Sequence, residues 1–327
     1  MNTHPRDALF EAGDLPPALP VCDHYCGVAA RMRKSLELQA EMGPVFDITL
    51  DCEDGAPIGG EAEHAHMAAE LALSAANVYG RVGARVHPVD HPSFAHDVAT
   101  LVGRAGTRLA YLMVPKPRDA ADVVRACAEI AHQRQVNGIE RALPVHVLIE
   151  THGALREVEA IAAHPDVESL SFGLMDFVSA HRGAIPASGM SAEGQFTHPL
   201  VLRAKLAIAA ACHGHAKTPS HSVVTEFNDL DALAEAATRA SRELGYTRMW
   251  SIHPSQIEPI VTAFAPSAAE VDLAIDIVES AQDAHWAPTR HRDTLHDRAS
   301  YRYFWQVLER AHRTGQPLPA QEIERFF

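Results

Sequence analysis

Two kinds of sequence pattern alternate eight times between residues 19 and 282, and this rhythm constrains the fold more than any other feature. Short runs rich in β-branched and aromatic residues are typical of strands, and Ala-, Leu- and Glu-rich runs with helical spacing follow them. The predicted strands are residues 19–26, 45–52, 84–88, 108–115, 144–151, 167–174, 216–224 and 248–254. The predicted helices are residues 32–42, 62–78, 94–105, 120–135, 155–164, 199–214, 230–244 and 268–282.

This alternation predicts parallel strands joined by right-handed crossovers. Eight units favour a closed α/β structure, the (β/α)8 or TIM barrel. A doubly wound open sheet is the alternative, but the motifs G-x-G-x-x-G and G-x-x-x-x-G-K-[ST] that would favour it are absent. We predict an N-terminal arm at 1–18, a catalytic barrel at 19–281 and an aromatic, basic, partly helical lid extension at 282–327 that docks on the barrel or on a neighbouring subunit.

Charge and cysteine usage disfavour several classes of protein. The chain has 28 Lys and Arg against 42 Asp and Glu, a net charge of −14 with His neutral, which disfavours nucleic acid but allows a local basic pocket for a phosphorylated ligand. Five Cys without a C-x-x-C pair fit a reducing cytosol better than a zinc site or a disulfide scaffold. No signal peptide is visible, and the longest apolar run, residues 206–212, is too short to cross a membrane. We therefore expect a cytoplasmic protein without a membrane partner.

Chemistry in such a barrel is expected at the carboxyl ends of the strands. Glu150 and Asp176 each follow an apolar strand, and the two strands are neighbours about 4.8 Å apart. Two carboxylates with waters and a substrate oxygen are the usual way to hold Mg²⁺, and Mn²⁺ takes similar ligands. Arg85, at the end of a third strand, is a natural partner for close carboxylates. Alone, either acid could instead be the N-cap of the next helix.

Other polar residues at strand ends have competing interpretations. Lys116 could form a Schiff base, contact the substrate or make a barrel salt bridge, and we favour the last two. His253 is interpreted as a packed, hydrogen-bonded histidine rather than a metal ligand, and the five Cys as buried small apolar groups. The stretch LDCEDGAP, residues 50–57, could be a metal cage, an acid/base pair or a helix cap.

Five segments in order resemble motifs of the HpcH/HpaI aldolase and citrate lyase beta-like family, in particular its CoA-ester lyases of the malyl-CoA lyase type. The resemblance covers roughly residues 20–280. LDCEDGAP is similar to the family's D-L-E-D-A motif, ARVHP to its R-V-N segment, LIETHGAL and SFGLMDF to its paired metal motifs, and SIHPSQI to its I-H-P-x-Q motif.

The resemblance implies a Mg²⁺-dependent barrel lyase that assembles as a homotrimer or homohexamer. It assigns Glu150 and Asp176 as metal ligands and Arg85 as the contact to substrate oxygens. Glu53 and Asp54 would bind metal waters and orient Arg85, so that LDCEDGAP is a second layer around the ion rather than a cage. The residues implied to contact CoA or substrate are Arg31, Arg33, Lys34, Met175 and His253. The lid segment RDTLHD makes Asp297 the candidate catalytic acid, in its own or a neighbouring subunit.

The implied reaction is reversible carbon–carbon cleavage of a 3-hydroxyacyl-CoA thioester of the malyl-, methylmalyl- or citryl-CoA type. Its products would be an acyl-CoA and a 2-oxo acid such as glyoxylate or oxaloacetate. The alternatives are a metal-dependent aldolase acting on free pyruvate- or oxaloacetate-type substrates, a citrate lyase beta subunit acting on an acyl-carrier thioester, and a non-catalytic barrel. Three segments depart from the family pattern, and they bear on CoA and acyl recognition: DHYCGVAA lacks F-V-P-G, Ser220 replaces a frequent Asp, and DTL replaces G-K-M.

Overall fold

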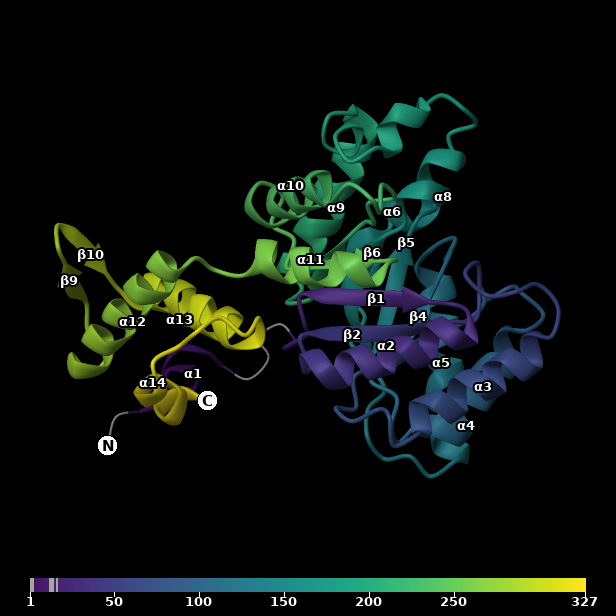
Figure 1. The fold of residues 1–327 in the computed structure, drawn as a ribbon, viewed down its shortest axis with the longest axis horizontal. Coiled ribbons are helices and arrows are strands. Elements are labelled where there is room, and N and C mark those ends of the chain that lie inside the picture. The colour runs from purple at the N-terminus through teal and green to yellow at the C-terminus, as the bar shows by residue number, and fades with distance from the viewer. Residues whose placement is uncertain (1–2, 12–14, 16) are drawn as a thin grey trace. The chain divides into compact units, whose positions relative to one another are not determined.

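The chain divides into two compact units in a computed structural model that describes residues 3–11, 15 and 17–327 (Figure 1). The larger unit is Pro17–Ala263. The smaller unit combines the described residues among 1–16 with Phe264–Phe327.

The larger unit is a closed barrel of eight parallel strands in chain order, which confirms the predicted (β/α)8 fold. Closure is made by β1 pairing with β8, where Cys22 lies opposite Met249. The strands are β1 Cys22–Cys26, β2 Phe46–Asp51, β3 Val82–Arg85, β4 Leu112–Val114, β5 Val145–Ile149, β6 Val167–Phe172, β7 Thr218–His221 and β8 Arg248–Ser251. Seven lie within the predicted runs, and β3 overlaps its predicted run, 84–88, only at Ala84 and Arg85.

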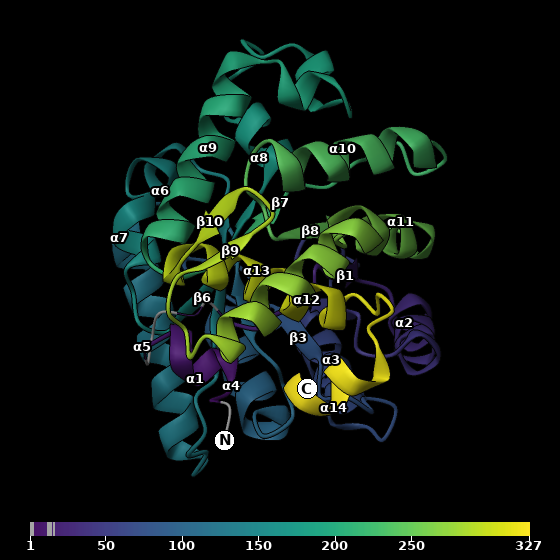
Figure 2. The same ribbon diagram turned by 90° about the vertical axis from the view of Figure 1, so that its left-hand side faces the viewer.

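Helices cover the outer side of the strands (Figure 1; Figure 2). They are α2 Ala29–Met42, α3 Glu61–Leu73, α4 Phe94–Ala105, α5 Ala120–Val136, α6 His152–Arg156, α7 Val158–Ala162, α8 Leu174–Ser179, α9 Pro199–Gly214, α10 Leu230–Arg242 and α11 Ile257–Phe264, with short 3-10 turns η1 Ala187–Met190, η2 Gly194–Phe196 and η3 Pro254–Gln256. No helix in the described part of the chain is long and apolar enough to span a membrane.

The eighth helix of the barrel differs from the prediction. The helix that follows β8 is the short α11, whereas the predicted eighth helix is α12, Ala268–Asp283, which belongs to the smaller unit. Both have apolar residues at helical spacing, so periodicity alone does not say which surface each one covers. The segment between β6 and α9, which carries α8, η1 and η2, was also not predicted as separate elements.

The barrel interior has two layers of different chemistry. One layer holds the buried guanidinium of Arg248, whose Nη1 lies 2.6 Å from Asp47 Oδ2 and whose Nη2 lies 3.2 Å from Asp23 Oδ2. The other is an apolar cluster of Tyr25, Met113, Leu148, Val223 and Trp250. The ion-paired layer lies at the first residues of β1, β2 and β8, and the apolar layer lies further along the strands. The carboxyl ends of the strands follow the apolar layer, and the candidate site lies there.

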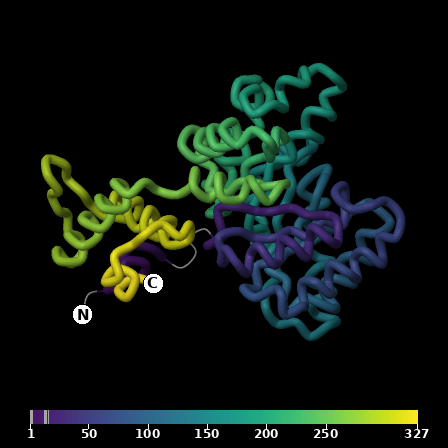
Figure 3. Tube along the Cα trace, viewed as in Figure 1, coloured from purple at the N-terminus to yellow at the C-terminus, as the bar shows by residue number. Residues whose placement is uncertain are grey.

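The smaller unit packs helices around its own apolar core. Its elements are α1 Pro5–Leu9, α12, the antiparallel hairpin of β9 Thr289–His291 and β10 Thr294–His296, α13 Arg298–Arg313 and α14 Ala320–Phe326. The N-terminal segment lies beside α13 (Figure 3), with Arg302 Nε donating to Leu9 O at 2.8 Å. Leu9, Tyr301, Trp305 and Phe326 are buried together. The predicted docking of the extension as a lid stays a prediction.

Candidate active site at the carboxyl ends of the strands

The pairing of neighbouring strands brings the residues predicted at the strand ends to the same level of the barrel. Asp51 ends β2 and lies opposite Arg85, the last residue of β3. Ile149 of β5 lies opposite Phe172 of β6, so Glu150 and Gly173 follow at the same level. Because carboxyl ends of parallel strands share one rim of a barrel, residues far apart in sequence meet there.

Arg85 is held by two carboxylates. Its Nε donates to Asp51 Oδ1 at 2.8 Å and its Nη2 to Asp51 Oδ2 at 2.5 Å, a two-pronged pair. Its Nη1 lies 3.2 Å from Glu53 Oε2. Burial alone lowers the pKa of Arg85, but the charges of Asp51 and Glu53 outweigh that effect and leave the pKa above its usual value. Arg85 is therefore a fixed cation, and the two contacts of Asp51 determine its orientation.

Lys116 connects four acids of the rim. Its Nζ lies 2.5 Å from Glu53 Oε1, 2.6 Å from Asp54 Oδ2 and 4.0 Å from Asp176 Oδ1. Its backbone N–H donates to Glu150 Oε1 at 2.8 Å. Lys116 has φ of 49°, a strained conformation for a non-glycine residue, and such strain persists only where the surroundings fix it. The predicted salt-bridge role is thus observed, and it lies within the site.

Glu150 is the most perturbed acid at this rim. It is 2 % exposed, and burial raises the pKa of its carboxyl well above the usual range. The charge of Asp176 adds to the rise, while Arg85 and the Lys116 N–H oppose it. Asp176, on the first turn of α8, is half-exposed. A buried carboxylate beside a second one is a costly arrangement that a bound cation would stabilise.

The residues at this position fit a hard divalent cation such as Mg²⁺. Glu150 and Asp176 offer carboxylate oxygens, and Glu53 and Asp54 lie around the same lysine. The neighbouring Gly173 is the residue that makes room, because a Cβ there would lie 2.2 Å from Glu150 Oε2. Waters or substrate oxygens would complete the six ligands that Mg²⁺ requires.

Changing Gly173 to Ala is expected to weaken Mg²⁺ binding while the barrel stays folded. The added methyl would displace the Glu150 carboxylate, and overpacking of this kind costs about 1–3 kcal/mol. The measurement is the Mg²⁺-induced rise in unfolding temperature. Gly214→Ala is the matched control, because a Cβ at Gly214 meets nothing within 4 Å. Equal Mg²⁺ responses of the two variants would contradict this account of Gly173.

A pocket of about 650 Å³ opens from Arg85 toward β1 and β8. Tyr25 and Trp250 stack in its wall with ring centroids 4.2 Å apart. Arg31 and Lys34, on α2, also line it. The other lining residues are His24, Cys26, Gly27, Ser35, Asp51, Gly55, Phe227, Ile252, His253 and Pro254. The pocket is lined by the anchored Arg85 and by two further basic side chains, which suits an anionic ligand.

The remaining predicted site residues differ in their local surroundings. Arg33 is exposed and does not line the pocket, and neither does Met175, which is 41 % exposed beside Asp176. His253 does line the pocket, and its ring also caps η3 by accepting from Ser255 N. Asp297 is the N-cap of α13, where its Oδ1 accepts from Ala299 N and Ser300 N.

Asp51 is the residue of the site that the sequence analysis missed. We expected Glu53 and Asp54 to orient Arg85. Glu53 does contact Arg85, but Asp51 makes the two-pronged contact, and Asp54 instead contacts Lys116. One signal was available: Asp51 shares a strand face with Glu53 and precedes a turn closed by Gly55, whose N–H donates to Asp51 Oδ2.

The fold and site together define a (β/α)8-barrel protein whose mouth gathers acidic, arginine and lysine side chains beside a pocket. The chain belongs to the HpcH/HpaI aldolase/citrate lyase family, which matches residues 42–254, more than half of its length. This confirms the resemblance noted in the sequence and the expectation of a carbon–carbon lyase.

Named relatives show the same relationship. The L-malyl-CoA/beta-methylmalyl-CoA lyase of Cereibacter sphaeroides (strain ATCC 17029) is 30 % identical over 84 % of this chain and 88 % of its own. A crystal structure described as a citrate lyase from Burkholderia xenovorans LB400 is 52 % identical over 100 % of both chains, with a TM-score of 0.85. The CitE protein of Mycobacterium tuberculosis, solved with magnesium, acetoacetate and coenzyme A, is 20 % identical over 90 % of this chain and 99 % of its own, with a TM-score of 0.67, and shows the shared fold.

Proposed function

We propose that this protein is a Mg²⁺-dependent lyase that reversibly cleaves a 3-hydroxyacyl-CoA thioester into an acyl-CoA and a 2-oxo acid. The observation that carries the proposal is the buried Glu150 beside Asp176 and the anchored Arg85, at the mouth of a pocket that reaches Arg31 and Lys34. The names of the malyl-CoA lyase relatives at about 30 % identity support the thioester class.

Glu150 and Asp176 would hold the ion, with Glu53 and Asp54 orienting its waters. When bound, the ion supplies Lewis-acid polarisation of the hydroxyl and carbonyl oxygens of the substrate. Lys116 keeps Glu53 and Asp54 in place through its ammonium and Glu150 through its backbone N–H. We keep Mn²⁺ as an alternative ion because it takes similar oxygen ligands.

Arg85 would stabilise the negative charge that develops on a substrate oxygen as the carbon–carbon bond breaks. A guanidinium has five N–H donors, and contacts to Asp51 and Glu53 occupy three of its nitrogens, so N–H groups on Nη1 and Nη2 remain for the substrate. Because its partners fix Arg85 before the substrate arrives, little reorganisation is needed during the reaction.

The thioester end would lie between the aromatic wall and the basic side chains of α2. Arg31 and Lys34 would contact CoA phosphates, with Arg33 nearby on the same helix, and Met175 and His253 would contact the acyl part. Asp297 is the proposed acid that returns a proton to the thioester enolate, and its role requires the smaller unit to act as a lid. We propose a homotrimer or homohexamer as the assembly.

Ligand-induced stabilisation tests the proposal against its alternatives. We expect Mg²⁺ to raise the unfolding temperature, and acetyl-CoA to raise it further; a ligand at 100 times its Kd stabilises by about 2.7 kcal/mol. Malyl-CoA should release glyoxylate only when Mg²⁺ is present. Stabilisation by pyruvate or oxaloacetate without any response to CoA esters would instead favour the aldolase acting on free acids. No response to Mg²⁺ or to any of these ligands would favour a non-catalytic barrel.

A further inference from the structure

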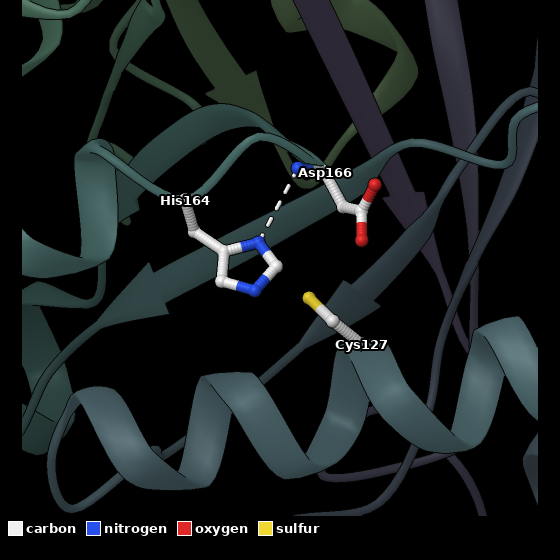
Figure 4. A group of neighbouring side chains, drawn as sticks. All are labelled: Cys127, His164 and Asp166. Atoms are coloured by element: carbon white, nitrogen blue, oxygen red, sulfur yellow. Dashed lines mark hydrogen bonds between the residues drawn. The ribbon is translucent and has the colours of Figure 1, made fainter.

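A second group of metal-ligand side chains lies at the opposite ends of the strands from Glu150. Cys127 Sγ, a nitrogen of His164 and a carboxylate oxygen of Asp166 all lie within 4.8 Å of one another (Figure 4). This is the one group of three such side chains found among the described residues. The three residues come from α5 and from the turn between α7 and β6, next to the first residue of β6.

The backbone holds this turn in place. His164 O accepts from Val167 N at 3.1 Å and from Lys217 Nζ at 3.2 Å, and Asp166 O accepts from Val145 N at 2.8 Å. Cys127 is carried by the 17-residue helix α5, which packs against α7. The three side chains therefore stand on fixed elements, as a preorganised metal site requires.

The ligand types define the class of ion. A thiolate, an imidazole and a carboxylate together suit Zn²⁺ and related transition-metal ions, whereas Mg²⁺ prefers oxygen ligands alone. Three protein ligands leave a fourth tetrahedral position for water, and access is open because Asp166 is exposed and His164 is half-buried. Asp166 N donates to His164 Nδ1 at 3.3 Å, a long contact whose loss on metal binding would cost little.

The linear sequence gave no zinc signal. Cys127 lies 37 and 39 positions before His164 and Asp166, and only folding brings the three side chains together.

We infer that Cys127, His164 and Asp166 form a binding site for one Zn²⁺-class ion per chain, separate from the rim that holds Glu150 and Asp176. The inference does not depend on the proposed function. It implies that transition-metal ions can bind this protein without replacing the ion used in catalysis.

Cobalt titration of the full chain tests this site, with Co²⁺ as the probe. We expect one Co²⁺ per chain to produce thiolate-to-cobalt charge-transfer absorption in the near ultraviolet. Cys127→Ser should abolish this absorption, and His164→Ala or Asp166→Asn should weaken Co²⁺ binding by more than about tenfold, since even the loss of an outer partner costs that much. His164 and Asp166 lie outside the core, so these two variants keep the test valid if Cys127→Ser unfolds.

Two control variants test whether the cobalt absorption comes from Cys127. Cys212→Ser, a buried thiol on α9, and Glu150→Gln, at the other end of the barrel, should both keep the absorption. The inference is overturned if Co²⁺ gives no charge-transfer absorption with the wild-type protein, or if the absorption persists in folded Cys127→Ser.

Discussion

Replacing Glu150 by Gln, or Asp176 by Asn, is expected to lower turnover of a 3-hydroxyacyl-CoA thioester by about 10³-fold or more. Each change keeps the shape of the side chain but removes a negative charge from the predicted ion site. The same variants should lose the Mg²⁺-induced rise in unfolding temperature. Glu150→Gln should also leave the protein at least as stable without Mg²⁺, because it replaces an acid whose charged form is disfavoured by burial and by Asp176 with a neutral group.

Two further variants give this prediction its controls. Glu235→Gln changes an exposed residue of α10 and should leave turnover and the Mg²⁺ response unchanged. Glu53→Gln should reduce turnover but keep most Mg²⁺ binding, since Glu53 contacts Arg85 and Lys116 rather than serving as a predicted ligand. Near-wild-type turnover by folded Asp176→Asn would rule out its role as a ligand. Loss of Mg²⁺ binding in Glu53→Gln as complete as in Glu150→Gln would move Glu53 into the ligand set.

Replacing Arg248 by Met is expected to lower the free energy of unfolding by about 3–5 kcal/mol. Arg248 is 0 % exposed and contacts Asp23 and Asp47, which are also 0 % exposed. Without the guanidinium, two buried carboxylates remain close together with no cation between them. Such a loss is a large part of the total stability of a typical domain, which is about 5–15 kcal/mol. Urea unfolding of the metal-loaded wild type and variant would measure it.

The matched control for this change is Arg203→Met, on the exposed side of α9, which should alter stability by less than about 0.5 kcal/mol. Adding Asp23→Asn and Asp47→Asn to Arg248→Met should recover part of the loss, because the unpaired charges are then removed. If Arg248→Met and Arg203→Met were equally stable, the buried ion pairs would contribute nothing net to folding.

The eight strands could be read from the sequence because each is a short apolar run bounded by turn residues, and their order followed from the alternation with helices. The rim positions of Arg85, Glu150 and Asp176 followed in turn, since the carboxyl ends of barrel strands share one edge. The assignment of α11 and α12 could not be read, because both have the same helical periodicity and differ only in the surface that each one covers.

The sequence by itself determined the closed barrel and the set of acids at its mouth, because local periodicity and strand direction fix both. Only the tertiary structure decided which acid holds Arg85 and where the Lys116 ammonium lies, since both contacts depend on side-chain positions between different strands. The same reason explains the group of Cys127, His164 and Asp166: α5 and the α7–β6 turn meet through packing, and a linear spacing rule does not describe that contact.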